Sequence, residues 1–234
     1  MSRGLRIQYP GAIYHVTSRG NRRQDIVVDD RDRNEFWERI REAVIKYRWE
    51  MYAAVLLTNH FHLFLRTLEA NLARGMQSLL GGYARFFNAR YQRSGHLFQA
   101  RYRCHLIENA SYFWTVSRYV HLNPSPILVW HPADWPWSTY AGYVDPARRF
   151  DLVAYDSLLA AWHGEFGGPD AATHYRSYVE SALGSLNPSP FVDAVDGWIL
   201  GSQQFADDIR QRLSPPTRRL SSVGSRTQPL RSAE

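Results

Sequence analysis

The sequence predicts an α+β fold in which an antiparallel β-sheet carries helices on one face. The first observation is the order of the elements between residues 12 and 122: strand, helix, strand, strand, helix, strand and helix. This βαββαβ-like order is a known supersecondary arrangement of an antiparallel sheet with packed helices. The second observation is that 44% of the 234 residues are hydrophobic, which is enough to bury one core.

Strands are predicted where β-branched and aromatic residues cluster without Gly or Pro. The first covers residues 12–18. The second, over residues 50–57, turns at Thr58 and Asn59 into a third strand that ends near residue 66. A fourth is predicted within residues 95–103, where a turn precedes alternating basic and aromatic side chains.

Helices are predicted where apolar residues recur every three or four positions. Asp29 and Asp30 can cap the first helix, because their carboxylates accept hydrogen bonds from free backbone N–H groups. The third helix ends before Pro124, since proline disfavours helix in the residue before it. The three predicted helices cover about residues 31–47, 72–91 and 110–122.

The character of the sequence changes near residue 145. Short helical patterns separated by Gly- and Pro-rich links follow, and the last residues are rich in Ser, Arg and Pro. We therefore expect a main domain over residues 1–144, a small helical extension over residues 145–213 and a disordered tail over residues 214–234.

The composition indicates a polyanionic partner. The net charge is +6, the isoelectric point is about 9.6, and Lys46 is the only lysine among the 28 basic residues. Arginine binds phosphate through two parallel hydrogen bonds and stacks on bases. Cys104 is the single cysteine, which excludes an intrachain disulfide, and no apolar run has the length of a signal peptide or a membrane span. We expect a soluble, cytoplasmic protein with no membrane partner.

Two histidines in the third strand form a candidate metal site. Side chains alternate along a strand, so His60 and His62 share one face, whereas Phe61 and Leu63 point to the opposite face and can enter a core. Two imidazoles at this spacing can bind one metal ion. A half-exposed polar face with no ligand role is the alternative interpretation of an isolated His-x-His pattern.

The third predicted helix carries a candidate nucleophile. Tyr119 and Asn123 are four residues apart and project from one helix face, whereas His121 lies about 200° round the helix and is interpreted as structural. If this helix crosses the sheet, the Tyr119 hydroxyl can approach a metal bound by the histidines, and Asn123 can add an oxygen ligand.

Two groups of basic residues are candidate DNA contacts. Arg19, Asn21, Arg22 and Arg23 surround a Gly-Asn turn, and Arg101 and Arg103 alternate with aromatic residues in the fourth predicted strand. The functional interpretation is that both groups bind phosphate. The alternatives are a solvated turn for the first group and a salt-bridged edge strand for the second.

A tyrosine beside a metal site is suited to cleavage of DNA by transesterification. A divalent ion stabilises negative charge on the scissile phosphate. A tyrosine oxygen can attack this phosphate and form a covalent intermediate, which keeps the phosphodiester energy for rejoining. Because the ordinary pKa of tyrosine is near 10, the attack requires a nearby metal or base.

The motifs together resemble the single-tyrosine HUH transposases, and among them the REP-associated tyrosine transposases. The resemblance rests on His60-Phe61-His62, on the run from Tyr119 to Pro124, and on three further segments at residues 10–16, 95–102 and 135–140. It implies the HUH nuclease fold, with a ferredoxin-like sheet, and a Mg²⁺- or Mn²⁺-dependent single-stranded DNA endonuclease and strand transferase. Such an enzyme acts as a monomer or homodimer at hairpins of palindromic repeats, through a 5′-phosphotyrosine intermediate.

The same resemblance implies individual roles. His60 and His62 are metal ligands, Tyr119 is the nucleophile, and Asn123 stands where related enzymes have a glutamine ligand one methylene longer. Imidazole ligands alone would suit zinc equally well.

Three other functions are compatible with parts of this pattern. A non-catalytic DNA- or RNA-binding module would keep the arginines without needing Tyr119. An HUH nuclease of another kind, a relaxase or a replication initiator, generally has other His and Tyr spacings. A metal hydrolase that uses water as nucleophile is disfavoured, because the chain has no His-Glu-x-x-His motif or acidic ligand set.

Overall fold

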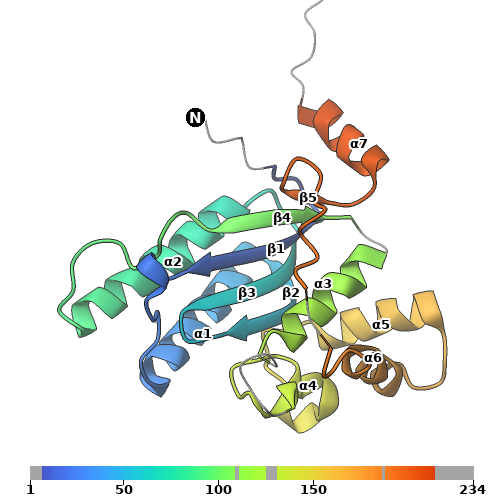
Figure 1. Ribbon diagram of the computed structural model, residues 1–234, viewed down its shortest axis with the longest axis horizontal. Helices are drawn as coiled ribbons and strands as arrows, with labels where there is room; N and C mark the ends of the chain where they lie inside the picture. The colour runs from blue at the N-terminus through green and yellow to red at the C-terminus, as the bar shows by residue number, and fades with distance from the viewer. Residues whose placement is uncertain (1–6, 109–110, 125–130, 186–187, 214–234) are drawn as a thin grey trace, which may run out of the picture.

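The computed structural model describes residues 7–108, 111–124, 131–185 and 188–213. The described strands form one sheet in the order β2-β3-β1-β4-β5 (Figure 1). Neighbours from β2 to β4 are antiparallel, and β5 joins β4 in parallel. The strands are β1 (Ala12–Arg19), β2 (Trp49–Leu56), β3 (His60–Thr67), β4 (Arg103–Ile107) and β5 (Ile199–Leu200).

The predicted α+β class and the predicted order of the elements are confirmed. The three main helices are α1 (Asp30–Tyr47), α2 (Leu72–Arg90) and α3 (Ser111–Leu122). Asp29 is the N-cap of α1, and its side chain accepts a hydrogen bond from Asp32 N at 3.2 Å. The expected tail over residues 214–234 lies outside the described residues.

The fourth strand was placed too early by the sequence. β4 begins at Arg103, so Arg101 precedes the strand and only Arg103 belongs to it. Residues 95–102 instead run alongside the turn after β1, where Gly20 and Phe98 form an isolated bridge. Alternation of basic and aromatic residues cannot distinguish a strand of the sheet from a segment held by a few backbone hydrogen bonds at its end.

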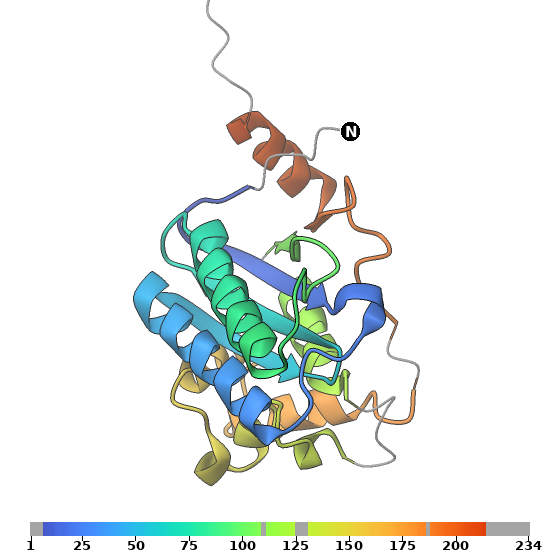
Figure 2. The same ribbon diagram turned by 90° about the vertical axis from the view of Figure 1, so that its left-hand side faces the viewer.

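The two faces of the sheet are covered by different helices. Phe61 packs against Phe36 of α1 at 5.1 Å between ring centroids, and α2 packs beside α1 on the same face (Figure 2). On the other face Phe64 packs against Phe113 of α3 at 4.7 Å. Helices therefore cover one face as predicted for α1 and α2, while α3 crosses the face that carries the histidines.

The helices after residue 140 are α4 (Ala141–Val144), α5 (Tyr155–Phe166), α6 (Ala171–Glu180) and α7 (Gln203–Leu213). Of these, α4, α5 and α6 pack beside α3, whereas α7 lies next to β5 at the other end of the molecule (Figure 1). Trp114 of α3 meets Trp162 of α5 at 4.8 Å between ring centroids, and Ser117 hydrogen-bonds Tyr175 of α6. These buried contacts make the extension part of the same hydrophobic core. No helix in the described part of the chain is long and apolar enough to cross a membrane.

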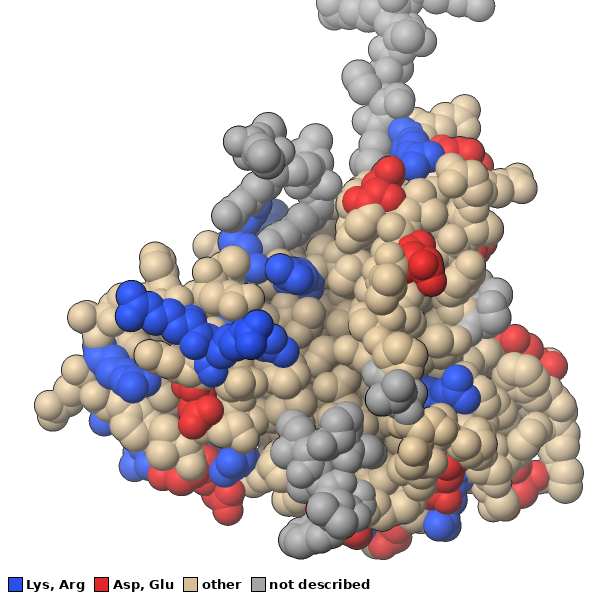
Figure 3. Space-filling view, in the orientation of Figure 1, with Lys and Arg blue, Asp and Glu red and all other residues tan. Residues whose placement is uncertain are grey.

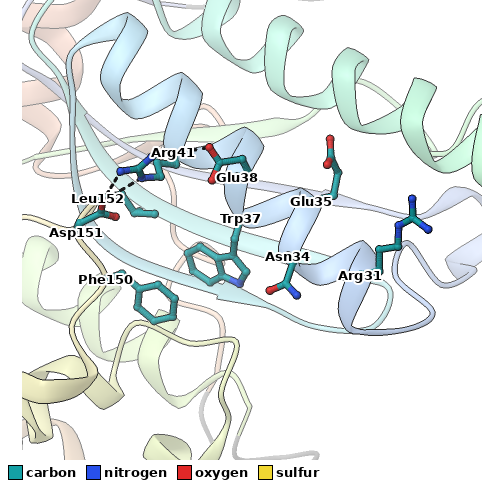
Figure 4. A pocket seen from close by; sticks show the side chains of 9 residues that line it. All are labelled: Arg31, Asn34, Glu35, Trp37, Glu38, Arg41, Phe150, Asp151 and Leu152. Carbon is teal, nitrogen blue, oxygen red and sulfur yellow. Dashed lines mark hydrogen bonds and ion pairs between the residues drawn. The ribbon is translucent and has the colours of Figure 1, made fainter.

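A second set of contacts joins the extension to α1. Trp37 stacks on Phe150 at 4.8 Å, and Arg41 forms a 2.6 Å ion pair with Asp151 (Figure 4). Just after these residues, Ala154 N donates to Met51 O of β2 at 2.8 Å. The connection thus satisfies part of the outer edge of β2, which would otherwise expose unpaired backbone groups.

Three glycines lie inside α2, where each costs about 1 kcal/mol relative to alanine. A Cβ atom at Gly75 would lie 2.1 Å from the Trp49 ring, so packing requires that glycine. A Cβ atom at Gly81 would meet only Arg85 Nη1, at an ordinary 3.6 Å. The fold therefore requires Gly75 but does not require Gly81.

Candidate active site

His60 and His62 lie on the face of β3 that α3 crosses. Their ring centroids are 5.2 Å apart, and the ring planes meet at 75°. His62 is 6% exposed, whereas His60, opposite Arg19 of β1, is half-buried at the end of the strand. The two imidazoles thus form a pair that opens toward one end of the sheet.

Tyr119 of α3 lies against this pair. Its ring centroid is 5.6 Å from that of His62, with the rings nearly perpendicular at 82°. The contact joins residues 57 positions apart in sequence, because α3 packs across β2 and β3. The structure thus brings together the phenol and the imidazoles that the sequence singled out.

Asn123 follows the last residue of α3 and reaches the same place. Its side chain lies close enough to the His60 ring to affect the pKa of that histidine, and its Nδ2 donates a 3.4 Å hydrogen bond to Tyr119 O. The asparagine side chain is therefore long enough to contact a candidate metal ligand, even though it is one methylene shorter than glutamine.

The Nδ1 atom of each histidine lies within hydrogen-bonding distance of a neighbouring side chain. His60 Nδ1 lies 2.7 Å from Asn59 Oδ1, and His62 Nδ1 lies 2.8 Å from His15 Nε2. Partners of this kind fix the orientation and tautomer of metal-binding histidines. Within the described residues, no group of three or more His, Cys, Asp or Glu side chains is arranged to hold a metal ion. A metal here would need oxygen ligands from Asn123, substrate or water.

Burial sets the protonation state of the pair. It lowers the pKa of His60 to about 4, and the positive charge of Arg19 adds to this effect, while the Asn123 side chain, whose amide oxygen can accept from a protonated ring, opposes it. Burial also lowers the pKa of His62 to about 3, assisted by His60 and Arg19. Both rings are therefore neutral at neutral pH, which is the form that binds metals.

His121 occupies the opposite side of α3, as the helical spacing predicts. It is fully buried, and its ring lies 5.1 Å from the rings of both Tyr140 and Tyr143. Burial lowers its pKa to about 3. Its surroundings are those of a core residue.

Two residues of the site were not identified from the sequence. His15, interpreted there as a strand-face residue, is 1% exposed and makes the hydrogen bond to His62. Phe191 of the extension stacks on His15 and His105 at 4.4 and 4.2 Å between ring centroids, and lies 5.7 Å from Tyr119. The alternation of β1 offered a signal for His15, whereas nothing in the sequence around Phe191 indicated its position.

The predicted basic turn lies at the same end of the sheet. Asn21–Arg23 form a short 3-10 turn, η1, in which Arg22 and Arg23 are exposed and have left-handed φ angles of 53° and 62°. Backbone strain of this kind is found at functional sites. Gly20 is required before the turn, because a Cβ atom there would lie 2.0 Å from Gln24 O.

The arginines at this end have no acidic partner among the described residues. None of the ion pairs within the described ranges involves the arginines at positions 19, 22, 23, 101 and 103. Figure 3 shows basic side chains gathered over η1 and the segment that precedes β4. This surface can receive phosphates without first breaking an ion pair.

An imidazole pair facing a phenol beside a basic surface is suited to phosphodiester chemistry, which indicates a DNA-processing enzyme. The family model described as "Transposase IS200 like" matches residues 8–123. This part of the chain, which contains the whole histidine–tyrosine cluster, belongs to the IS200-like transposases. The protein is accordingly a DNA-binding transposase. Among curated proteins, no sequence matches the chain.

Of three similar solved structures, the first shares the fold. This structure, described as a REP-associated tyrosine transposase bound to a REP hairpin, is 20% identical, with a TM-score of 0.52 over 65% of this chain and 90% of its own. A putative transposase from Deinococcus radiodurans is 19% identical, with a TM-score of 0.36 over 47% of this chain and 88% of its own. A tRNA(His) guanylyltransferase from Saccharomyces cerevisiae is 10% identical, with a TM-score of 0.40 over 81% and 86%.

Proposed function

We propose that the protein is a metal-dependent single-stranded DNA endonuclease and strand transferase that acts at DNA hairpins through a covalent 5′-phosphotyrosine. The observation that carries the proposal is the 5.6 Å contact between the rings of Tyr119 and His62. This contact places a phenol, the group that a covalent phosphotyrosine requires, beside a histidine pair whose Nδ1 atoms are both held by neighbours.

The donor set fits a divalent metal ion with open positions. With their Nδ1 atoms held by Asn59 and His15, His60 and His62 can present Nε2 to an ion, and Asn123 can add its amide oxygen. Catalytic metal sites keep positions open for substrate in this way. We propose Mg²⁺ or Mn²⁺, which when bound stabilises charge on the scissile phosphate.

Tyr119 is the proposed nucleophile. Its phenolic oxygen bonds to the scissile phosphorus as the bond from phosphorus to the 3′-oxygen breaks. The phenolic proton is released, and the leaving oxygen takes up a proton to become a free 3′-hydroxyl. Attack of a 3′-hydroxyl on the phosphotyrosine reverses these bond changes and transfers the strand.

The arginines at the end of the sheet are proposed to hold the DNA. Arg19 lies beside the histidine pair, where its guanidinium can bind a phosphate next to the cleaved one. Asn21, Arg22 and Arg23 on η1, with Arg101 before β4, extend this surface beyond the end of β1. Arg103 instead pairs with Thr17, the β1 partner of His62, and so lies two strands from that histidine on the same face. The hairpin in the structure of the REP-associated transposase supports a hairpin as the substrate.

One chain contains every residue of the proposed site. Tyr119 contacts His62 of the same chain, so cleavage by a monomer is possible without a tyrosine from another copy. A homodimer in which each subunit keeps its own site is equally compatible with this arrangement.

The test uses labelled single strands from palindromic repeats flanking the gene, incubated with Mn²⁺. The expected result is a cleaved strand and a protein–DNA adduct that survives a denaturing gel. Tyr119→Phe should abolish both products while hairpin binding persists. An adduct that forms undiminished with Tyr119→Phe would refute the proposal.

A further inference from the structure

A groove of about 760 Å³ lies on the outer side of α2, between this helix and residues 95–102. It is separate from the histidine–tyrosine cluster. Phe98, one of its lining residues, meets Phe61 at 6.4 Å between ring centroids, and Phe61 points to the face covered by α1 and α2. The groove therefore belongs to the side of the sheet opposite Tyr119.

The walls of the groove combine an apolar floor with a polar rim. Leu80 and Ala84 of α2 contribute apolar surface, with Met76 buried beneath them, and Gln77, Gln99 and Arg101 are exposed around it. None of its lining residues is acidic, whereas the recess between α1 and residues 150–152 is lined by Glu35, Glu38 and Asp151 (Figure 4). The charge of the groove thus suits a polyanion.

The groove shares a wall with the basic turn. Asn21 N donates to Leu97 O at 2.8 Å, and Gln99 N donates to Arg19 O at 3.0 Å. Residues 97–99 therefore have η1 on one side and the groove on the other, as the arrangement of α2, η1 and this segment in Figure 2 shows. Backbones paired in this way are about 5 Å apart, so DNA on the arginines passes next to the groove.

Gly81 lines the groove, and the fold does not require a glycine there. An added Cβ atom would meet only the flexible end of Arg85, at 3.6 Å. A helix interior disfavours glycine. The missing side chain instead leaves space in the groove, which is a reason for glycine if the groove receives a flat ligand.

We propose that the groove binds an unpaired base of the DNA that the arginine turn holds. A base offers flat apolar faces to the floor, and its edge offers hydrogen-bonding groups to Gln77, Gln99 and Arg101. Because the groove lies on the face opposite Tyr119, the bound base positions the DNA and is not next to the cleaved phosphate. This inference rests on the proposed function, since it assigns part of the same substrate.

The test narrows the groove without touching the catalytic cluster. Gly81→Leu extends a side chain into the space, and Gly164→Leu is the matched control, since Gly164 is inside α5 with no atom within 4 Å of its added Cβ. Binding is measured by fluorescence anisotropy at one salt concentration, with a hairpin that has a single-stranded flank and with a fully paired hairpin.

Gly81→Leu should weaken binding of the flanked hairpin at least about tenfold, equivalent to one stacked base. It should change binding of the fully paired hairpin less than about twofold, and Gly164→Leu should change neither. Thermal unfolding establishes that Gly81→Leu is folded; Gly81→Ala, the smaller step, should then weaken flanked binding by an intermediate factor.

Three results would overturn the inference. The first is equal binding of the flanked hairpin by wild type and a folded Gly81→Leu. The second is an equal loss for both hairpins. The third is a change of oligomeric state with Gly81→Leu, seen by light scattering, which would make the groove a contact between copies. Failure of the wild type to bind any hairpin would instead reject the proposed function.

Discussion

The two faces of β3 differ although their residues alternate along one strand. Phe61, Leu63 and Leu65 are completely buried under α1 and α2. On the other face Phe64 is buried against α3, but His62 and His60 lead from that core to the arginine-rich end. One face therefore serves only packing, while the other changes from packing to chemistry within a few residues.

The arginines of the molecule show the same division. On α1, Arg39 pairs with Glu35 at 2.7 Å and Arg41 pairs with Asp151 at 2.6 Å. At the end of the sheet, Arg22 and Arg23 have no described carboxylate partner and stand on a strained turn. We infer that the paired arginines stabilise α1 and its contact with the extension, whereas the others are kept available for an anion.

The largest expected effect separates the two faces of β3. His60→Ala removes a proposed metal ligand at a half-buried position, so metal-dependent cleavage should fall by at least about 10³-fold while the protein stays folded. Its neighbour Phe61→Ala leaves a cavity in the core and should cost about 3–5 kcal/mol of unfolding free energy. Single-turnover cleavage with Mn²⁺ and urea denaturation measure the two effects.

Undiminished cleavage by His60→Ala at saturating Mn²⁺ would remove His60 from the metal site. If His60→Ala instead loses as much stability as Phe61→Ala, the two faces do not divide packing from chemistry in the way that we infer.

A smaller effect is expected from His15, which contacts His62 and no proposed substrate. His15→Leu removes the partner of His62 Nδ1, and loss of such a partner typically weakens metal affinity about 10- to 100-fold. Mn²⁺ affinity is followed by electron paramagnetic resonance on hairpin complexes in a Tyr119→Phe background, which cannot cleave. His15→Gln keeps a hydrogen-bond acceptor and should retain most of the affinity.

His105→Leu is the matched control, because His105 stacks on Phe191 as His15 does but has no recorded hydrogen bond to His62. Equal loss of Mn²⁺ affinity in His15→Leu and His105→Leu would assign the effect to packing around Phe191 and not to the hydrogen bond.

The sequence was sufficient for the parts of this arrangement that depend on local spacing. Alternation placed His60 and His62 on one face of the third strand. The i, i+4 relation placed Tyr119 and Asn123 on one face of the third helix. The order of the elements predicted the sheet. That α3 would cross the histidine face was only a condition in the sequence argument, because spacing within one element says nothing about which face another element covers.

The parts that the sequence did not predict depend on long-range packing. Phe191 reaches Tyr119 from the extension, more than 70 residues away, through a segment with no periodic pattern. The start of β4 was misplaced because the segment around Phe98 has a strand-like sequence but pairs with Gly20 only through an isolated bridge, outside β4. Such contacts are selected by the shape of the assembled core, which local propensity does not encode.

The smallest expected effect compares the two groups of arginines. Affinity falls as salt rises, and each phosphate contact that is lost reduces the steepness of this fall, as the slope of log affinity against log salt concentration, by about 0.7 to 0.9. Neutralising Arg22 and Arg23 together to Gln should therefore reduce the slope for hairpin binding by about 1.4 to 1.8, with cleavage chemistry intact at saturating DNA. Neutralising Arg39 and Arg41 together should leave the slope unchanged, since their carboxylate partners already occupy them. Equal slopes for wild type and both double variants would show that η1 is a solvated turn, and a reduced slope only for the α1 variant would move the DNA to the opposite side of the molecule.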